Sequence, residues 1–169
     1  MTIMFISDIH GSKNNLKIAR ELYDKEQADL VIILGDVFYG GNPSREIEDI
    51  INSFPNKVVI KGNNDFSTDI FKDSIEFVDS YSFSSFGKKF FCSHGNVYNV
   101  TRLPNKEFDV MVFGHTHAGR IFRDGQKYFI NPGSISFPRA GTENSYIIVD
   151  SKGIYLKNLY QIVLDKILW

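Results

Sequence analysis

The sequence predicts an α/β fold in which two packed β-sheets are flanked by helices. In the first half of the chain, short apolar runs alternate with segments of helical periodicity, which is typical of parallel strands joined by crossover helices. In the second half, strand patterns follow one another with glycine-containing turns between them. Such turns indicate antiparallel pairing in a second sheet.

Five apolar runs are expected to be buried strands, because each is short, β-rich and bounded at its exit by glycine or a polar residue. They cover residues 2–7, 30–34, 57–61, 89–93 and 110–113.

Two helices are expected between the first three of these strands. Residues 14–27 carry apolar side chains at helical spacing. In the second segment, Asn42 is expected as the cap and Pro43 as the first helical position, with the helix ending before Pro55. The order of strand, helix, strand, helix and strand predicts parallel strands joined by right-handed crossovers.

From Tyr81 onward, hairpin turns are expected at residues 86–87, 124–125 and 152–153, each of which contains a glycine. Residues 159–169 are apolar at both strand and helix spacing, so the sequence leaves their structure open. This segment could cover a sheet edge or pair with another subunit.

The chain is expected to form one domain over residues 1–169. Its 43% hydrophobic and 23% charged fractions are typical of a globular protein. No internal repeat, low-complexity tract or linker suggests a boundary. The formal net charge of -1 and the lack of a long basic run indicate no nucleic-acid partner.

Residues 1–9 are apolar, but they lack a basic leader, contain Asp8 and are too short to span a bilayer. We interpret them as a strand of a cytoplasmic protein with no membrane partner. The single cysteine, Cys92, excludes an internal disulfide framework and is expected to be a small buried side chain.

Potential metal ligands follow all five predicted strands, and all four histidines of the chain are among them. A lone histidine is more often a core or surface residue than a ligand. Here, however, the carboxyl ends of strands in an α/β sheet meet at one edge, so the polar exits are expected to converge. The candidate ligands are Asp8, His10, Asp36, Asn63, His94, His115 and His117.

The spacing and the donor atoms of these residues predict a pair of metal ions. Asp8 and His10 are two residues apart, as are His115 and His117, so each pair points to the same side of an extended chain. Carboxylate, amide and imidazole donors suit Mn²⁺, Fe²⁺, Co²⁺, Ni²⁺ or Zn²⁺. Seven ligands exceed the need of one ion, whereas two ions ~3.5–4 Å apart could share a bridging carboxylate.

With these motifs the chain resembles the calcineurin-like metallophosphoesterases, and among them the small YfcE-like phosphodiesterases. The blocks that carry the resemblance occur in order as Asp8-Ile9-His10, Gly35-Asp36, Gly62-Asn63-Asn64-Asp65, His94, Gly114-His115-Thr116-His117 and Asn131-Pro132-Gly133-Ser134. The resemblance covers nearly the whole chain. It implies the metallo-dependent phosphatase fold, a four-layer αββα sandwich with two mixed sheets.

The resemblance also implies a hydrolase acting on phosphoric ester bonds, with a small phosphate-ester substrate. A hydroxide bridging two divalent metal ions, Mn²⁺ foremost, would attack phosphorus. By this analogy Asp8, His10 and His117 hold the first ion. Asn63, His94 and His115 hold the second, and Asp36 bridges the two. Asp36, Asn63 and His94 would then be the metal-assisted catalytic residues.

One position departs from many members of the superfamily. Where they carry a histidine as the proton donor to the leaving group, this chain has Asn64, which cannot act as a general acid. YfcE-like relatives often lack this histidine too. We therefore expect a preference for diesters with good leaving groups. Asp65 is expected to support the site by orienting His94 or another ligand.

Residues 131–134 are interpreted as a rigid turn beside the site, and Arg139 as a surface residue that could also meet a phosphate. Relatives often self-associate, so the apolar tail that ends at Trp169 could contribute to a homodimer or a higher homo-oligomer.

Three other functions compete with the phosphodiesterase. A retromer subunit with a similar fold is a non-catalytic scaffold, but its metal site is degraded, whereas the ligand set here is complete. Protein phosphatases and dinucleoside polyphosphatases usually have Asp-Arg-Gly where this chain has Asp36-Val37-Phe38. A structural zinc site needs only four ligands.

Overall fold

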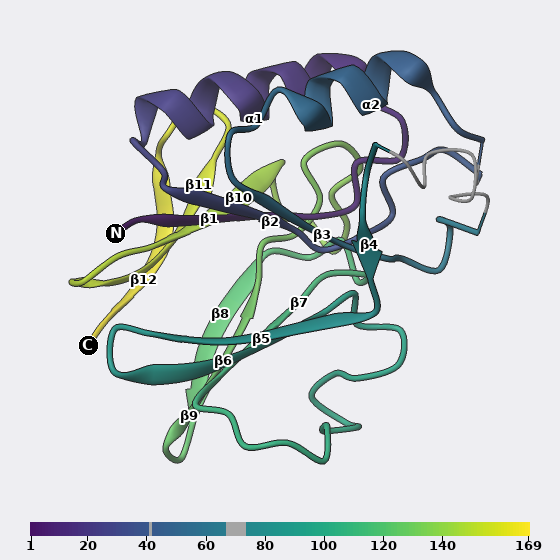
Figure 1. Ribbon diagram of the computed structural model, residues 1–169. Helices are drawn as coiled ribbons and strands as arrows, with labels where there is room; N and C mark the ends of the chain where they lie inside the picture. Colours follow the sequence, from purple (N-terminus) through teal and green to yellow (C-terminus); the bar gives the residue numbers. More distant parts are fainter. Residues whose placement is uncertain (41, 67–73) are drawn as a thin grey trace.

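The computed structural model describes residues 1–40, 42–66 and 74–169. Two β-sheets pack face to face, and both described helices lie over the outer face of the larger sheet (Figure 1). The α/β fold class and the two packed sheets are therefore confirmed.

The larger sheet has seven strands. They are β1 (Ile3–Ile6), β2 (Leu30–Ile33), β3 (Lys57–Ile60), β4 (Phe77–Val78), β10 (Ser145–Val149), β11 (Gly153–Asn158) and β12 (Val163–Leu168). Their order in the sheet is β12-β11-β10-β1-β2-β3-β4. Strands β1 to β4 run parallel, as predicted for the first half of the chain, whereas β10 pairs antiparallel with β1 and continues into an antiparallel meander.

The smaller sheet has five strands. They are β5 (Ser80–Ser85), β6 (Lys88–Ser93), β7 (Val110–Phe113), β8 (Arg120–Asp124) and β9 (Lys127–Asn131). Their order is β5-β6-β7-β9-β8, with antiparallel hairpins at the two edges and parallel pairing of β7 with β6 and with β9.

The prediction of an antiparallel second sheet for the whole second half was therefore wrong in two respects. The smaller sheet is mixed, as the family resemblance implies, and β10 to β12 belong to the larger sheet, which is mixed as well. All three glycine turns do form hairpins as expected. A turn in the sequence predicts only that the two strands next to it pair with each other, not which sheet they join. Strand β10 is buried at every position, and a strand buried on both faces belongs in the interior of a sheet, here beside β1.

Helix α1 (Lys13–Lys25) connects β1 to β2 and begins at a capped end. The hydroxyl of Ser12 accepts a hydrogen bond from the backbone N–H of Asn15 at 3.4 Å, which satisfies one of the free donors of the first turn. Its buried face has the spacing predicted from sequence, and consists of Leu16, Ala19, Leu22 and Tyr23. Neither described helix has the length and apolar composition to cross a membrane.

Helix α2 (Arg45–Asn52) begins later than predicted. The backbone of Asn42 instead forms an isolated bridge with Tyr39, with its N–H 3.0 Å from the Tyr39 carbonyl oxygen. With this bridge, Asn42 and Pro43 lie outside the helix, and Ser44 occupies the N-cap position, where its side chain makes no capping bond.

The outer face of the smaller sheet carries no helix within the described residues. Its apolar side chains Phe91, Met111 and Phe129 form a third cluster with Phe108 and Tyr98, which belong to the segment between β6 and β7. The family resemblance implies a layer of helix on this outer face. Among the described residues, the loop between β6 and β7 covers it instead.

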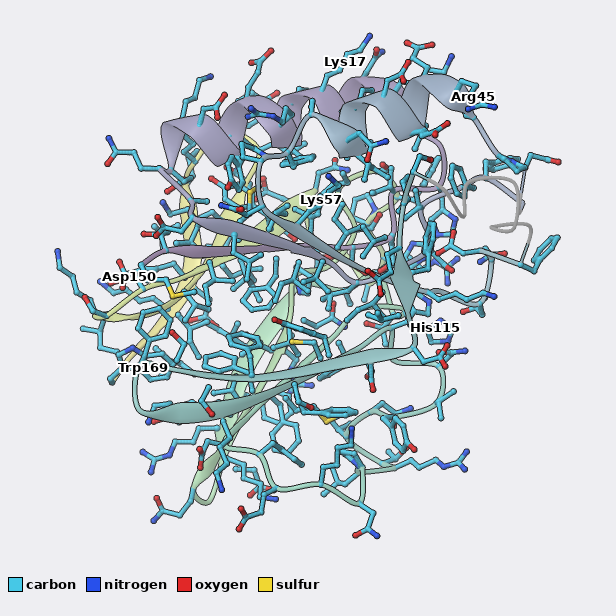
Figure 2. The ribbon with its side chains drawn as sticks, in the orientation of Figure 1. Lys17, Arg45, Lys57, His115, Asp150 and Trp169 are labelled. Atoms are coloured by element: carbon cyan, nitrogen blue, oxygen red, sulfur yellow. The ribbon has the colours of Figure 1, made fainter. Side chains whose placement is uncertain are left out.

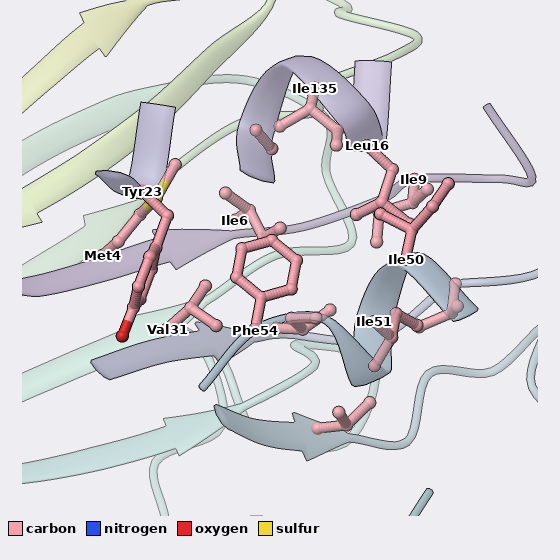
Figure 3. Close-up of a cluster of buried hydrophobic side chains, with 14 of the residues drawn as sticks. Met4, Ile6, Ile9, Leu16, Tyr23, Val31, Ile50, Ile51, Phe54 and Ile135 are labelled. Atoms are coloured by element: carbon pink, nitrogen blue, oxygen red, sulfur yellow. The ribbon is translucent and has the colours of Figure 1, made fainter. Parts of the chain in front are cut away.

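Strand β1 is buried on both faces. Ile3 and Phe5 face the smaller sheet, whereas Met4 and Ile6 face the helices, where Figure 3 shows them with other members of that cluster. Burial on both faces explains why this run does not alternate between apolar and polar residues. Cys92 is fully buried between the sheets as expected, and burial raises the pKa of its thiol.

The C-terminal segment, whose structure the sequence left open between helix and strand, forms β12, the edge strand beside β11. Trp169 then packs its ring edge-on against Tyr128 of the smaller sheet, and its indole N–H donates to the Asp150 carbonyl at 2.9 Å. The end of the chain thus joins the two sheets at the side opposite to the exits of β1 and β2.

We expect the two helix starts to respond differently to substitution. Ser12→Ala should lower the free energy of unfolding by about 1 kcal/mol, because it removes a capping bond. Ser44→Ala is the matched control and should cost less, because the Ser44 side chain caps nothing. Urea denaturation of both variants measures the difference, and equal losses would contradict this assignment of the caps.

Candidate metal centre

The structure brings all seven predicted ligands together beyond the carboxyl ends of five strands. Strands β1, β2 and β3 are parallel in one sheet, and β6 and β7 are parallel in the other. The exits of both sheets meet at one edge, as expected for ligands of an α/β protein. Figure 2 shows His115 at this edge, at the end of the sheets opposite to Trp169.

The first group of potential ligands consists of Asp8, His10, Asp36 and His117. One donor atom from each lies within 4.8 Å of all the others. The Nε2 atom of His117 is 3.1 Å from Nε2 of His10 and 3.3 Å from Oδ1 of Asp8. Nε2 of His10 is 3.6 Å from Oδ2 of Asp36.

The second group shares Asp36 with the first and adds His94 and His115. Nε2 of His94 is 3.4 Å from Oδ1 of Asp36 and 3.1 Å from Oδ1 of Asn63. The two oxygens of Asp36 therefore face different histidines, with Oδ1 toward His94 and Oδ2 toward His10. This is the geometry expected of a bridging carboxylate.

Backbone carbonyls orient two of the histidine rings. Nδ1 of His94 lies 2.7 Å from the Leu34 carbonyl oxygen, and Nδ1 of His117 lies 2.8 Å from that of Phe137. Each Nδ1–H donates to its carbonyl, so in the neutral ring the lone pair is on Nε2 and points into the centre. Metal-binding histidines are usually held in this way.

Asp8 contributes a buried oxygen with an unmet hydrogen-bonding capacity. Its side chain is fully buried, and Oδ2 accepts from the backbone N–H of His115 at 3.0 Å. Oδ1 has no hydrogen-bond donor among the described residues. A buried carboxylate oxygen without a donor costs free energy, and a cation would offset that cost. The residues present therefore fit a pair of divalent ions.

Asn64 binds the shared carboxylate directly. Its backbone N–H donates to Oδ1 of Asp36 and its amide to Oδ2, both at 2.8 Å. Burial by itself would raise the pKa of Asp36, but hydrogen bonding and charge interaction with His94 and the two bonds from Asn64 hold it well below its usual range. At the position of the absent general acid, this chain has a residue that orients the shared carboxylate.

Five of the ligands have a strained backbone. Their φ angles lie between 45° and 67°, in the left-handed region that non-glycine residues rarely adopt. Strain of this kind costs of order 1–3 kcal/mol per residue and gathers at functional sites. The five are Asp8, His10, Asp36, His115 and His117.

Two glycines allow the loops of the centre to approach closely. A Cβ atom at Gly62 would overlap the backbone nitrogen of Asp36, and one at Gly114 would overlap the hydroxyl of Ser7. Glycine is therefore required at both positions for steric reasons.

Asp65 supports the site through backbone groups next to Asp36 and Asn63, rather than by binding the side chain of His94 or of another ligand. Its Oδ1 accepts from the backbone N–H of Val37 at 2.9 Å and of Phe38 at 3.2 Å, and its Oδ2 accepts from that of Gly62 at 2.9 Å. Asp65 thus ties the loop after β2 to the loop after β3. No sequence pattern identifies these partners, because two of the three are backbone groups distant along the chain.

Residues 131–134 form the rigid turn that was predicted, and they connect two strand exits. The Ser134 hydroxyl donates to the Asp8 carbonyl at 2.6 Å, and the Asn131 amide donates to the Gly114 carbonyl at 2.9 Å. Both side chains are buried. The turn therefore fixes the backbone next to Asp8 and His115.

Comparison with known proteins agrees with this arrangement. The family model described as the calcineurin-like phosphoesterase superfamily domain matches residues 1–153. The chain belongs to this superfamily. It is a hydrolase of the phosphoesterase class and is similar to phosphodiesterase YfcE of Escherichia coli, with 30% identity over 89% of this chain and 88% of that protein. A solved structure of YfcE from Escherichia coli matches 99% of both chains with a TM-score of 0.88 and 25% identity.

Two further similarities extend the comparison. Phosphodiesterase MJ0936 of Methanocaldococcus jannaschii is 32% identical over 79% of this chain and 83% of its own length. Vps29 of Entamoeba histolytica, solved in complex with zinc, has a TM-score of 0.67 at 19% identity and covers 99% of both chains. That similarity shows the fold alone.

We expect Asp65→Asn to weaken metal binding without removing a ligand. The new amide would point an N–H at a backbone N–H, which should displace the loops that carry Asp36 and Asn63. Metal affinity should fall by roughly 10- to 100-fold, as for other residues that orient ligands. Equilibrium dialysis with Mn²⁺ measures it. Asp124→Asn, at the far hairpin, should bind Mn²⁺ normally, and unchanged affinity in the Asp65 variant would contradict this role.

Proposed function

We propose that this protein is a metal-dependent phosphodiesterase that uses two divalent ions, Mn²⁺ foremost, held by the seven residues of the centre. The observation that carries this proposal is the position of Asp36, whose two oxygens face two separate groups of ligands. Two bound ions would supply a hydroxide nucleophile and would neutralise the charge that develops on the phosphoryl oxygens.

The residues of the chain hold these ions in place. Asp8, His10 and His117 would bind the first ion, and Asn63, His94 and His115 the second, with Asp36 between them. Carbonyl groups fix the rings of His94 and His117 before any ion binds. The strained backbone of the ligands is consistent with a site built for function.

The hydrolysis of diesters is supported by the names of two relatives and by Asn64. YfcE and MJ0936 are both called phosphodiesterases. Asn64 cannot protonate a leaving group, and its amide is already bound to Asp36. Leaving groups that need no proton should therefore depart most readily.

The purified protein should hydrolyse bis-p-nitrophenyl phosphate when Mn²⁺ is added and lose the activity with a chelator. Asp36→Asn should reduce kcat/KM by more than the roughly 10- to 100-fold typical of a residue that only orients a ligand. Lys152→Met, on the exposed β10–β11 turn, should leave it unchanged. Bound metal without activity toward any diester would favour the alternative of a non-catalytic scaffold.

The rate should depend steeply on the leaving group. For a series of aryl diesters, kcat/KM should fall as the pKa of the leaving phenol rises, because general acid catalysis, worth ~10²–10⁴-fold, has no donor at Asn64. Alkyl monoesters should be poor substrates under the same metal conditions. If alkyl monoesters were turned over as well as aryl diesters, the inference from Asn64 would fail.

A further inference from the structure

A hollow of about 600 Å³ opens beside the first group of ligands. His10 and His117 form its inner side, and Tyr39, Phe137 and Arg139 also line it. Its volume lies in the range of sites for small organic molecules. The phosphoester chemistry proposed above uses none of these three outer residues.

Phe137 is coupled to the ligands through both its backbone and its ring. Its carbonyl accepts from Nδ1 of His117, and its ring meets that of His10 edge-on, with centroids 5.9 Å apart. The side chain is nevertheless 50% exposed, and that of Tyr39 on the same hollow is 68% exposed. Two exposed aromatic rings next to a catalytic centre offer a surface on which a flat ring can pack.

Arg139 adds a positive charge to the same hollow. Its backbone is fixed, because its N–H donates to the His117 carbonyl at 3.0 Å and its own carbonyl accepts from the Thr142 hydroxyl at 2.8 Å. Its guanidinium has no carboxylate partner among the residues that the structure describes. A free guanidinium on a fixed backbone is suited to bind an anionic group of a ligand.

We propose that this hollow binds one ester arm of the substrate, and that the arm is an aromatic group carrying a negative charge. Tyr39 and Phe137 contact the ring of the arm, and Arg139 binds its anionic group. This inference rests on the proposed phosphodiesterase function. If the phosphoryl group binds between the two groups of ligands, an ester arm attached to it can extend into the hollow beside His10.

A second hollow, beside His94, differs in character. Lys61, Asp79, Ser93 and Asn96 are among the residues that line it. Its aromatic residue, Tyr98, packs edge-on against Phe91 and belongs to the outer cluster of the smaller sheet. The aromatic arm is therefore assigned to the hollow beside His10.

Three p-nitrophenyl diesters test the assignment, because they share one leaving group and differ in the second arm. The arms are methyl, phenyl and 4-carboxyphenyl. We expect kcat/KM to rise in this order in the wild-type protein. Tyr39→Ala and Phe137→Ala should each reduce the preference for phenyl over methyl by roughly five- to tenfold. Arg139→Met should selectively reduce the preference for 4-carboxyphenyl over phenyl.

Binding can be measured without turnover. Diphenylphosphinate and dimethylphosphinate have no ester bond to hydrolyse, so isothermal titration of the Mn²⁺-loaded protein should give a lower Kd for the diphenyl compound. That difference should shrink in the Phe137→Ala variant. Tyr160→Ala and Arg123→Met are the matched controls, since Tyr160 is an exposed aromatic that lines a different hollow and Arg123 lies near the far hairpin. Neither should change a preference.

The outcomes separate the two proposals. If no diester is hydrolysed but diphenylphosphinate still binds more tightly than dimethylphosphinate, the proposed function fails and the arm site stands. If all diesters are hydrolysed at similar rates and the two phosphinates bind equally, the arm site is wrong and the phosphodiesterase stands. An equal loss with all three arms in the Arg139→Met variant would place Arg139 on the phosphoryl group and overturn its assignment to the arm.

Discussion

The two halves of the candidate metal centre depend on the carboxylate of Asp36. It lies at the exit of β2, and its two oxygens face histidines that follow strands of different sheets. Because one ligand is shared, the strand exits of both sheets must keep a fixed position relative to one another. Two bonds from Asn64 fix the orientation of this carboxylate.

Much of the surrounding structure meets this requirement. Asp65 joins the loops after β2 and β3, whereas Asn131 and Ser134 join the exits of β7 and β1. These polar connections hold loops whose ligands have a left-handed backbone. The strain is tolerated because buried hydrogen bonds and close glycine contacts leave the loops few alternative conformations.

The apolar core and the candidate metal ligands lie in different parts of the fold. The apolar clusters lie between the sheets and beneath the helices, whereas the ligands extend past the strand ends into two hollows of different character. Members of this fold family can therefore differ in the residues that line these hollows while the ligand geometry stays the same. Vps29 shares the fold at 19% identity, and a shared fold by itself does not decide function.

The sequence by itself determined the strands of the first half, the buried face of α1 and the identity of the seven residues that meet at the centre. These features follow from local periodicity and from polar residues that directly follow strands. The tertiary structure alone decided that β10 to β12 join the larger sheet, that α2 begins after Ser44, and that Asp65 binds backbone groups of distant loops. Each of these depends on contacts between segments far apart in the chain, which a local pattern does not encode. The hollow beside His10 is of the same kind, because Tyr39, which follows β2, and Phe137, which follows β9, line it together only in the folded chain.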